Sequence, residues 1–279
     1  MSTPASAILV DRSAQIRSVR ATAASVLHYR QLIRSLVAKD LKLKYRGSVL
    51  GFVWSMVSPL LMLGVYTLAF KYIIYRGNTP EGFVFILLLG ILAWNFFVGS
   101  LVMSTGAIVD NAGLLKSVLF PRAVLPISSV LFNFAQYVLT VAVLIPVMVV
   151  IYRVPVTPLV VLYPLFLFLQ LVFATGLALA LSAAAAHLRD TRHLLDIALQ
   201  ALFWTTPIVW SLSLVDAKWH PLVLLSPMSP FVVAYQRTLY YGVWPGAEVT
   251  VLAIVYAFGA LAIGTAFFLH SDRRFSELV

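Results

Sequence analysis

The sequence predicts an all-α membrane protein with six transmembrane helices, an amphipathic helix before the first of them, and short re-entrant helices between the fifth and the sixth. Three observations lead to this fold class. The 279 residues are 61% hydrophobic and only 11% charged, whereas soluble domains are about 45–50% apolar and about 25% charged. The apolar residues gather in long runs without charge, and the cations gather between alternate runs.

Six apolar stretches are long enough for membrane-spanning helices, which need about 20 mostly apolar residues. They are residues 49–74, 83–105, 124–151, 158–186, 195–213 and 248–270. Residues 1–28 are expected to be a flexible cytoplasmic tail, and residues 29–279 a single membrane domain. The chain has no cysteine, which excludes disulfides, thiolate metal sites and cysteine nucleophiles.

The placement of the cations predicts the orientation. Fifteen of the 20 Lys and Arg residues lie in segments 1–46, 106–123, 184–196 and 271–279. With six spans, all four segments fall on one side, which the positive-inside rule assigns to the cytoplasm. Both termini are therefore expected in the cytoplasm. Topology accounts for the net charge of +10, so no nucleic-acid partner is needed.

Residues 30–46, RQLIRSLVAKDLKLKYR, have one apolar side and one cationic side when wound as a helix. Asp40 and Lys44 interrupt the apolar side, but at i,i+4 spacing they can pair. We expect this helix to lie in the cytoplasmic interface. The alternative is a helix whose apolar side packs on protein. The cations that would meet the headgroups are Lys39, Lys42, Lys44 and Arg46.

The segment between the fifth and sixth spans, about residues 214–247, is too apolar for a solvated loop. It contains Pro221, Pro227, Pro230 and Pro245, so no single helix can cross it. Two short helices that dip back into the outer leaflet, broken near Ser226–Pro230, satisfy both constraints. Such backbone is tolerated at membrane depth where protein covers it.

Two inner loops also carry structure. NAGLLKSVLFPRAVLP (111–126) has helical apolar spacing that Pro121 ends, and AHLRDTRHLL (186–195) offers Asp190 or Thr191 as an N-cap. Apolar residues on a cytoplasmic loop suggest a docking site for another protein. His187, Asp190 and His193 could share a helix face, which makes a metal site conceivable beside the plainer reading of a surface loop.

The spans hold almost no ionisable residues. This weighs against an ion-coupled carrier and against an intramembrane protease or transferase, because these need carboxylates or histidines at membrane depth. No GxxxxGK[ST] motif is present, so no nucleotide is bound through a P-loop. The spans hold aromatic, amide and hydroxyl side chains instead. These suit sugar rings, but they also suit helix packing and interface belts.

Five stretches, taken in order, resemble polysaccharide-export permeases of the ATP-binding-cassette superfamily, which serve O-antigen, teichoic acid, capsule and mycobacterial galactan export. KYRGSVLGFVWSMVSPLL (44–61) resembles the start of these permeases, and NAGLLKSVLFPRAVLP is similar to their first cytoplasmic loop. HLRD (187–190) resembles their second loop. FWTTPIVW (203–210) and LSPMSPFVVAYQ (225–236) resemble their fifth span and re-entrant segment.

The resemblance implies a permease without catalytic residues, cofactor or metal of its own. It implies a homodimer with two separate ATPase subunits, which would bind ATP and magnesium, and a polyprenyl-diphosphate-linked glycan moved out of the cytoplasm. The cations of residues 39–46 could then attract the lipid diphosphate. The residues implied in coupling to the ATPase are Asn111, Leu114, Leu115, Lys116, Phe120, Pro121, Arg122, Arg189, Asp190 and Arg192.

A channel for a glycan needs a wall that stacks on sugars and closes to ions. The expected lining residues are Tyr66, Phe70, Phe203, Trp204 and Thr205, with Pro207 bending the fifth span. Their alternative role is packing. Alternatives for the whole chain are a permease for a drug or small lipid and a non-transport scaffold subunit of glycolipid synthesis. The composition is compatible with a high-GC actinobacterium, which makes galactan the leading glycan.

Overall fold

The computed structural model describes residues 28–48, 51–74, 82–117, 120–153, 157–188, 190–210, 212 and 215–272. Within these ranges the chain is helical and contains no β-strand. The α-helices, in chain order, are α3 (Arg30–Lys44), α4 (Trp54–Thr67), α5 (Phe83–Asp110), α6 (Ala112–Ser117), α7 (Val124–Tyr152), α8 (Leu162–His187), α9 (Thr191–Thr205), α10 (His220–Leu224), α11 (Ser229–Tyr235) and α12 (Ala247–Asp272).

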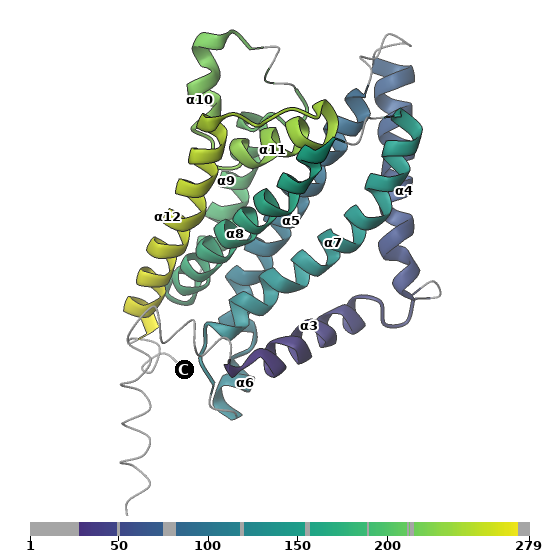
Figure 1. The fold of residues 1–279 in the computed structure, drawn as a ribbon. Coiled ribbons are helices and arrows are strands. Elements are labelled where there is room, and N and C mark those ends of the chain that lie inside the picture. Colours follow the sequence, from purple (N-terminus) through teal and green to yellow (C-terminus); the bar gives the residue numbers. More distant parts are fainter. Residues whose placement is uncertain are drawn as a thin grey trace, which may run out of the picture.

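Long helices form a bundle, and α3 lies across its lower end (Figure 1). The short helix α6 is also at the lower end, whereas α10 is at the upper end. Four helices in the described ranges are long and apolar enough to cross a membrane: α5, α7, α12, and α8 together with the 3-10 turn that precedes it. These four agree with the second, third, fourth and sixth predicted spans.

The first and fifth predicted spans form shorter α-helices. α4 has 14 residues and continues as a π-helix, Leu68–Ile74. α9 has 15 residues, a length of about 22 Å at 1.5 Å per residue. It ends at Thr205, and Thr206 is extended, because a residue before proline is disfavoured in the helical region. The prediction that Pro207 bends a helix running to residue 213 was therefore wrong, since the helix stops before the proline.

The apolar side of α3 packs on the protein itself. Ile33 and Leu36 are buried in one cluster with Val124 and Leu125 at the start of α7. This is the arrangement that we held as the alternative to an apolar side inserted in the membrane interface. The cationic side of α3 faces away from this cluster and stays exposed.

The predicted Asp40–Lys44 pair is not formed. Asp40 instead pairs with its neighbour Lys39, with 3.4 Å between Nζ and Oδ1. Lys44 donates a hydrogen bond to the amide oxygen of Gln136 on α7. The position of Lys44 on the apolar side of α3 explains this partner, because that side faces α7.

The segment between α9 and α12 forms two short helices, α10 and α11, separated by residues 225–228. All seven residues of α11 are buried, and the helix contacts α5, α8 and α12. A π-helix, Gln236–Tyr241, continues α11. The division into two helices broken near Ser226 agrees with the sequence analysis, and re-entry from the outer leaflet stays a prediction.

Small residues bring α8 and α12 into backbone contact. A Cβ added at Gly264 would overlap the carbonyl oxygen of Gly176, and a Cβ at Gly176 would overlap the backbone at Ala260. Such close approach is the usual role of glycine between membrane helices, where dispersion contacts replace the hydrophobic effect as the driving force.

A buried glutamine joins α8 to α5 and α11. Gln170 is fully buried, and its Nε2 donates to the carbonyl oxygen of Ala93 at 2.9 Å. Its Oε1 accepts a hydrogen bond from the Tyr235 hydroxyl at 2.6 Å. Both ends of the side-chain amide are thus satisfied, which a buried polar group requires.

Candidate functional site

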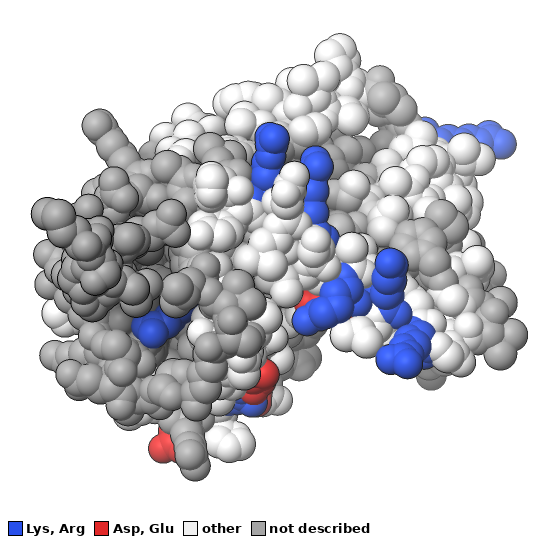
Figure 2. Space-filling view, turned by 90° about the horizontal axis from the view of Figure 1, so that it is seen from below, with Lys and Arg blue, Asp and Glu red and all other residues white. Residues whose placement is uncertain are grey.

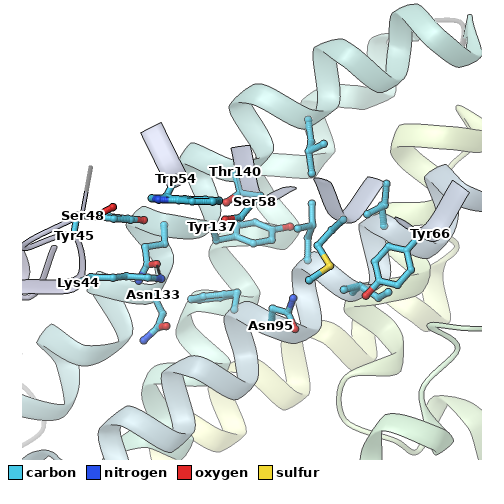
Figure 3. A pocket seen from close by; sticks show the side chains of 17 residues that line it. Lys44, Tyr45, Ser48, Trp54, Ser58, Tyr66, Asn95, Asn133, Tyr137 and Thr140 are labelled. Atoms are coloured by element: carbon cyan, nitrogen blue, oxygen red, sulfur yellow. Dashed lines mark hydrogen bonds between the residues drawn. The ribbon is translucent and has the colours of Figure 1, made fainter. Parts of the chain in front are cut away.

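A groove with a volume of about 530 Å³ lies between the end of α3 and helices α4, α5 and α7. Figure 3 shows Lys44, Tyr45 and Ser48 at one end of it and Tyr66 at the other. Most of its lining side chains are polar or aromatic with a polar tip. These are Lys44, Tyr45, Ser48, Trp54, Ser58, Tyr66, Asn95, Asn133, Gln136, Tyr137 and Thr140.

One wall of the groove is a stripe of polar residues on α7. Asn133, Gln136, Tyr137 and Thr140 follow one another at helical spacing, so they share one face. The Tyr137 hydroxyl is hydrogen-bonded to that of Tyr163, with 2.7 Å between the oxygens. Asn133 donates its amide to the carbonyl oxygen of Ser129 at 2.9 Å, and the Gln136 amide and the Thr140 hydroxyl complete the stripe.

Asn95 supplies an amide from α5, and the sequence analysis did not single it out. Its side chain is exposed to the groove in the middle of a 28-residue apolar helix. An exposed amide at this depth would be costly against lipid chains, so it indicates a polar covering. The signal was present in the sequence as an isolated amide inside the second apolar run.

Lys44 marks the lower end of the groove. Its ammonium donates to the Oε1 of Gln136 and lies 5.9 Å from the ring centre of Tyr45. Partial burial lowers the pKa of Lys44. Within the described part of the chain, no carboxylate forms an ion pair with this lysine. Its positive charge is therefore available to an anion that reaches the groove.

The other three cations assigned to the lipid diphosphate lie elsewhere. Lys39, Lys42 and Arg46 line a separate hollow on α3. Figure 2, which views the molecule from below, shows several Lys and Arg side chains gathered on this face. The structure therefore divides the predicted set, with Lys44 in the groove and the other three outside it.

The five predicted channel residues do not lie together. Tyr66 lines the groove, but Phe70, Phe203, Trp204 and Thr205 do not. Phe203 packs between Trp94 and Trp204, with ring centres 5.6 and 5.5 Å away, and Phe70 contacts the ring of Phe83. Trp204 is 64% exposed, and the Thr205 hydroxyl donates to the carbonyl oxygen of Leu202 at 3.1 Å.

The first predicted coupling loop forms α6 and packs partly on its own chain. Leu114, Leu115 and Phe120 contact the apolar cluster between α3 and the start of α7, which accounts for part of the helical apolar spacing in this loop. The Asn111 amide donates to the carbonyl oxygen of Ala107 at 2.9 Å and closes the end of α5. Pro121 and Arg122 are half-buried beside this cluster. The side chain of Lys116 and all of Arg189 lie outside the described residues.

An ion pair links the two predicted coupling loops. Arg192 Nη2 lies 2.8 Å from Oδ1 of Asp110, the last residue of α5. Of the two N-cap residues that the sequence offered, Asp190 takes the position in α9, although its carboxylate makes no capping hydrogen bond. Gly106 leaves room for the ion pair, because a Cβ there would overlap both side chains. The sequence analysis missed Asp110, an isolated acid at the end of an apolar run.

The conceivable metal site is not formed. Among the described residues, which include His187, Asp190 and His193, no three His, Cys, Asp or Glu side chains are grouped as metal ligands would be.

Comparison with known proteins adds an independent observation. A family model described as "ABC-2 type transporter" matches residues 31–240. The chain is 34% identical to an "O-antigen export system permease protein RfbA" of Myxococcus xanthus, over 95% of this chain and 100% of that protein. Two Klebsiella pneumoniae proteins of the same name are each 26% identical, over 89% of this chain and 95% of theirs.

Proposed function

Because this chain belongs to the ABC-2 type transporter family, we propose that it is the permease subunit of an ATP-driven polysaccharide exporter. The observation that carries the proposal is the 34% identity along the whole length of an O-antigen export permease. The groove agrees with it, since aromatic faces, amides and hydroxyls are the groups that bind sugar rings and their hydroxyl groups.

The proposed substrate is a glycan linked to a polyprenyl diphosphate, moved from the cytoplasm across the inner membrane of a bacterium. A long glycan needs a polar path, and in this proposal the polar stripe on α7, residues 133–140, forms part of its wall. The lipid diphosphate needs a cation at the cytoplasmic surface, and Lys44 supplies one at the lower end of the groove. In this proposal α4 and α9 complete a set of six spans, and the lower end of Figure 1 is the cytoplasmic end.

Energy must come from partner subunits, since the sequence has no P-loop motif. We place two ATPase subunits, which bind ATP and magnesium, against α6 and the start of α9. The Asp110–Arg192 ion pair joins the last residue of α5, just before α6, to the start of α9, so a movement of one loop would be passed to the other. A second copy of the chain would cover the exposed side of α9, where Trp204 and Thr205 could then face a path between the copies.

The test is deletion of the gene in its source strain. We expect the surface polysaccharide to disappear and its lipid-linked form to accumulate in the cytoplasm, and a plasmid copy should restore export. Purification of the tagged chain should also yield a subunit with a P-loop. Normal surface glycan after deletion would reject the proposal, and loss of a small lipid or drug efflux instead would favour the other permease class.

A further inference from the structure

The hydrogen bond between Lys44 and Gln136 joins the end of α3 to α7 at the lower end of the groove. Lys44 is the last residue of α3, and Gln136 lies in the polar stripe on α7. The bond spans 92 residues of sequence, so it fixes the position of the end of α3 against α7. Both residues line the groove, and Figure 3 places Lys44 at its end.

Lys44 is paired with a neutral amide and not with a carboxylate. A neutral amide is a weaker partner for an ammonium than a carboxylate or phosphate, because charge-assisted bonds in which both groups are ionised are the stronger ones. Lys39 has the carboxylate of Asp40 at 3.4 Å, whereas the partners of Lys44 within the described residues, the Gln136 amide and the ring of Tyr45, are both uncharged. A phosphate ester that reaches Lys44 would therefore displace Gln136.

Displacement would change what the groove offers to a ligand. With Lys44 attached, the Oε1 of Gln136 is occupied, although Asn133 and Thr140 lie one turn away on the same face. Once released, Gln136 regains an acceptor and joins these neighbours as a row of amide and hydroxyl groups. A sugar attached to the phosphate would lie along this row.

We propose that Lys44 and Gln136 form a phosphate-responsive latch: the phosphate ester of an amphiphilic ligand takes Lys44 from Gln136, and the freed amide then binds the adjoining sugar. The proposal rests on the proposed function for the identity of the sugar. It assigns the phosphate contact to Lys44 alone and gives Lys39, Lys42 and Arg46 no part in it.

The experiment measures ligand binding by the full-length chain in phosphatidylcholine nanodiscs. Trp54 lines the groove, so tryptophan fluorescence reports occupancy, and a Trp54→Phe variant identifies the part of the signal that comes from it. The probes are farnesyl diphosphate, farnesol and inorganic diphosphate. Nanodiscs that contain phosphatidylglycerol test whether a lipid headgroup takes the same place.

We expect Lys44→Gln to weaken farnesyl diphosphate binding about tenfold or more, the effect of one charge-assisted hydrogen bond, and Lys44→Arg to retain binding. Gln136→Leu should bind the diphosphate more tightly, because nothing has to be displaced. The matched control, Lys39→Gln with Lys42→Gln, should change the affinity less than about threefold. Competition by phosphatidylglycerol would identify the phosphate as a lipid headgroup, and its absence would favour the substrate.

Unchanged affinity in Lys44→Gln would overturn the latch. So would equal affinities for farnesol and its diphosphate, or a loss in Gln136→Leu as large as that in Lys44→Gln. If Lys44→Gln does not fold, Gln136→Leu and Lys44→Arg still decide the question. Failure of the latch leaves the gene-deletion result untouched, so it can be told apart from failure of the export function.

Discussion

Replacing Gln170 with leucine is expected to destabilise the bundle, although leucine is the more hydrophobic residue. The substitution removes the acceptor of the buried Tyr235 hydroxyl and a donor to the Ala93 carbonyl. The carbonyl keeps its helical hydrogen bond within α5, so most of the loss falls on the hydroxyl. A hydrogen bond between membrane helices contributes about 0.6 kcal/mol on average. Leaving a buried polar group without a partner costs more, about 1–3 kcal/mol, and this is what the substitution does to the Tyr235 hydroxyl. We therefore expect a loss of about 1–3 kcal/mol.

The assay is unfolding in mild detergent, followed by tryptophan fluorescence, for a double-mutant cycle with Tyr235→Phe. Once Gln170 is leucine, removing the Tyr235 hydroxyl should cost nothing or restore some stability, which gives a coupling energy of at least about 0.5 kcal/mol. Gln31→Leu, at an exposed site on α3, is the matched control and should leave stability unchanged. Additive effects of Gln170→Leu and Tyr235→Phe would refute the reasoning.

Three further predictions concern packing, topology and coupling. Gly264→Val should force α12 away from α8 and lower the free energy of unfolding by about 1–3 kcal/mol, measured in the same detergent assay; unchanged stability would contradict the backbone contact. A cysteine at Gly113, where a side chain meets open space, should react with a maleimide only after permeabilisation, and one at Lys218 in intact cells; the reverse pattern would invert the orientation. Arg192→Asp should reduce export, and a second change, Asp110→Arg, should restore it if the ion pair acts by joining the loops; no rescue would show that Arg192 acts through another partner.

The long helices follow from the sequence because hydropathy alone determines them. α5, α7, α8 and α12 begin within four residues of the predicted spans, since a run of apolar residues long enough to cross a bilayer has few alternatives to a helix. α9 was harder, because its length depends on Pro207 and on the N-cap at Asp190. The sequence analysis expected Pro207 to bend the helix. Pro207 instead ends it, because Thr206, the residue before the proline, is extended.

The groove could be predicted only in part. The spacing of three residues between Asn133 and Gln136 is enough to put them on one face of a helix, and helical spacing sets Lys44 on the apolar side of α3, apart from the other cations. Nothing in a single helix, however, shows that these two faces meet across 92 residues. The aromatic residues of α9 were proposed for the channel from their chemistry alone, which cannot tell a pore wall from a surface that meets lipid or a second copy.

The central claim is that this chain, together with an ATPase, moves a lipid-linked glycan across the membrane. The direct measurement uses inside-out vesicles that contain both subunits and the lipid-linked glycan, with a lectin outside to detect exposed sugar. We predict that ATP makes the glycan inaccessible to the lectin as it passes into the lumen, and that omitting either subunit abolishes the change. Equal loss of lectin binding in vesicles without this chain would contradict the account.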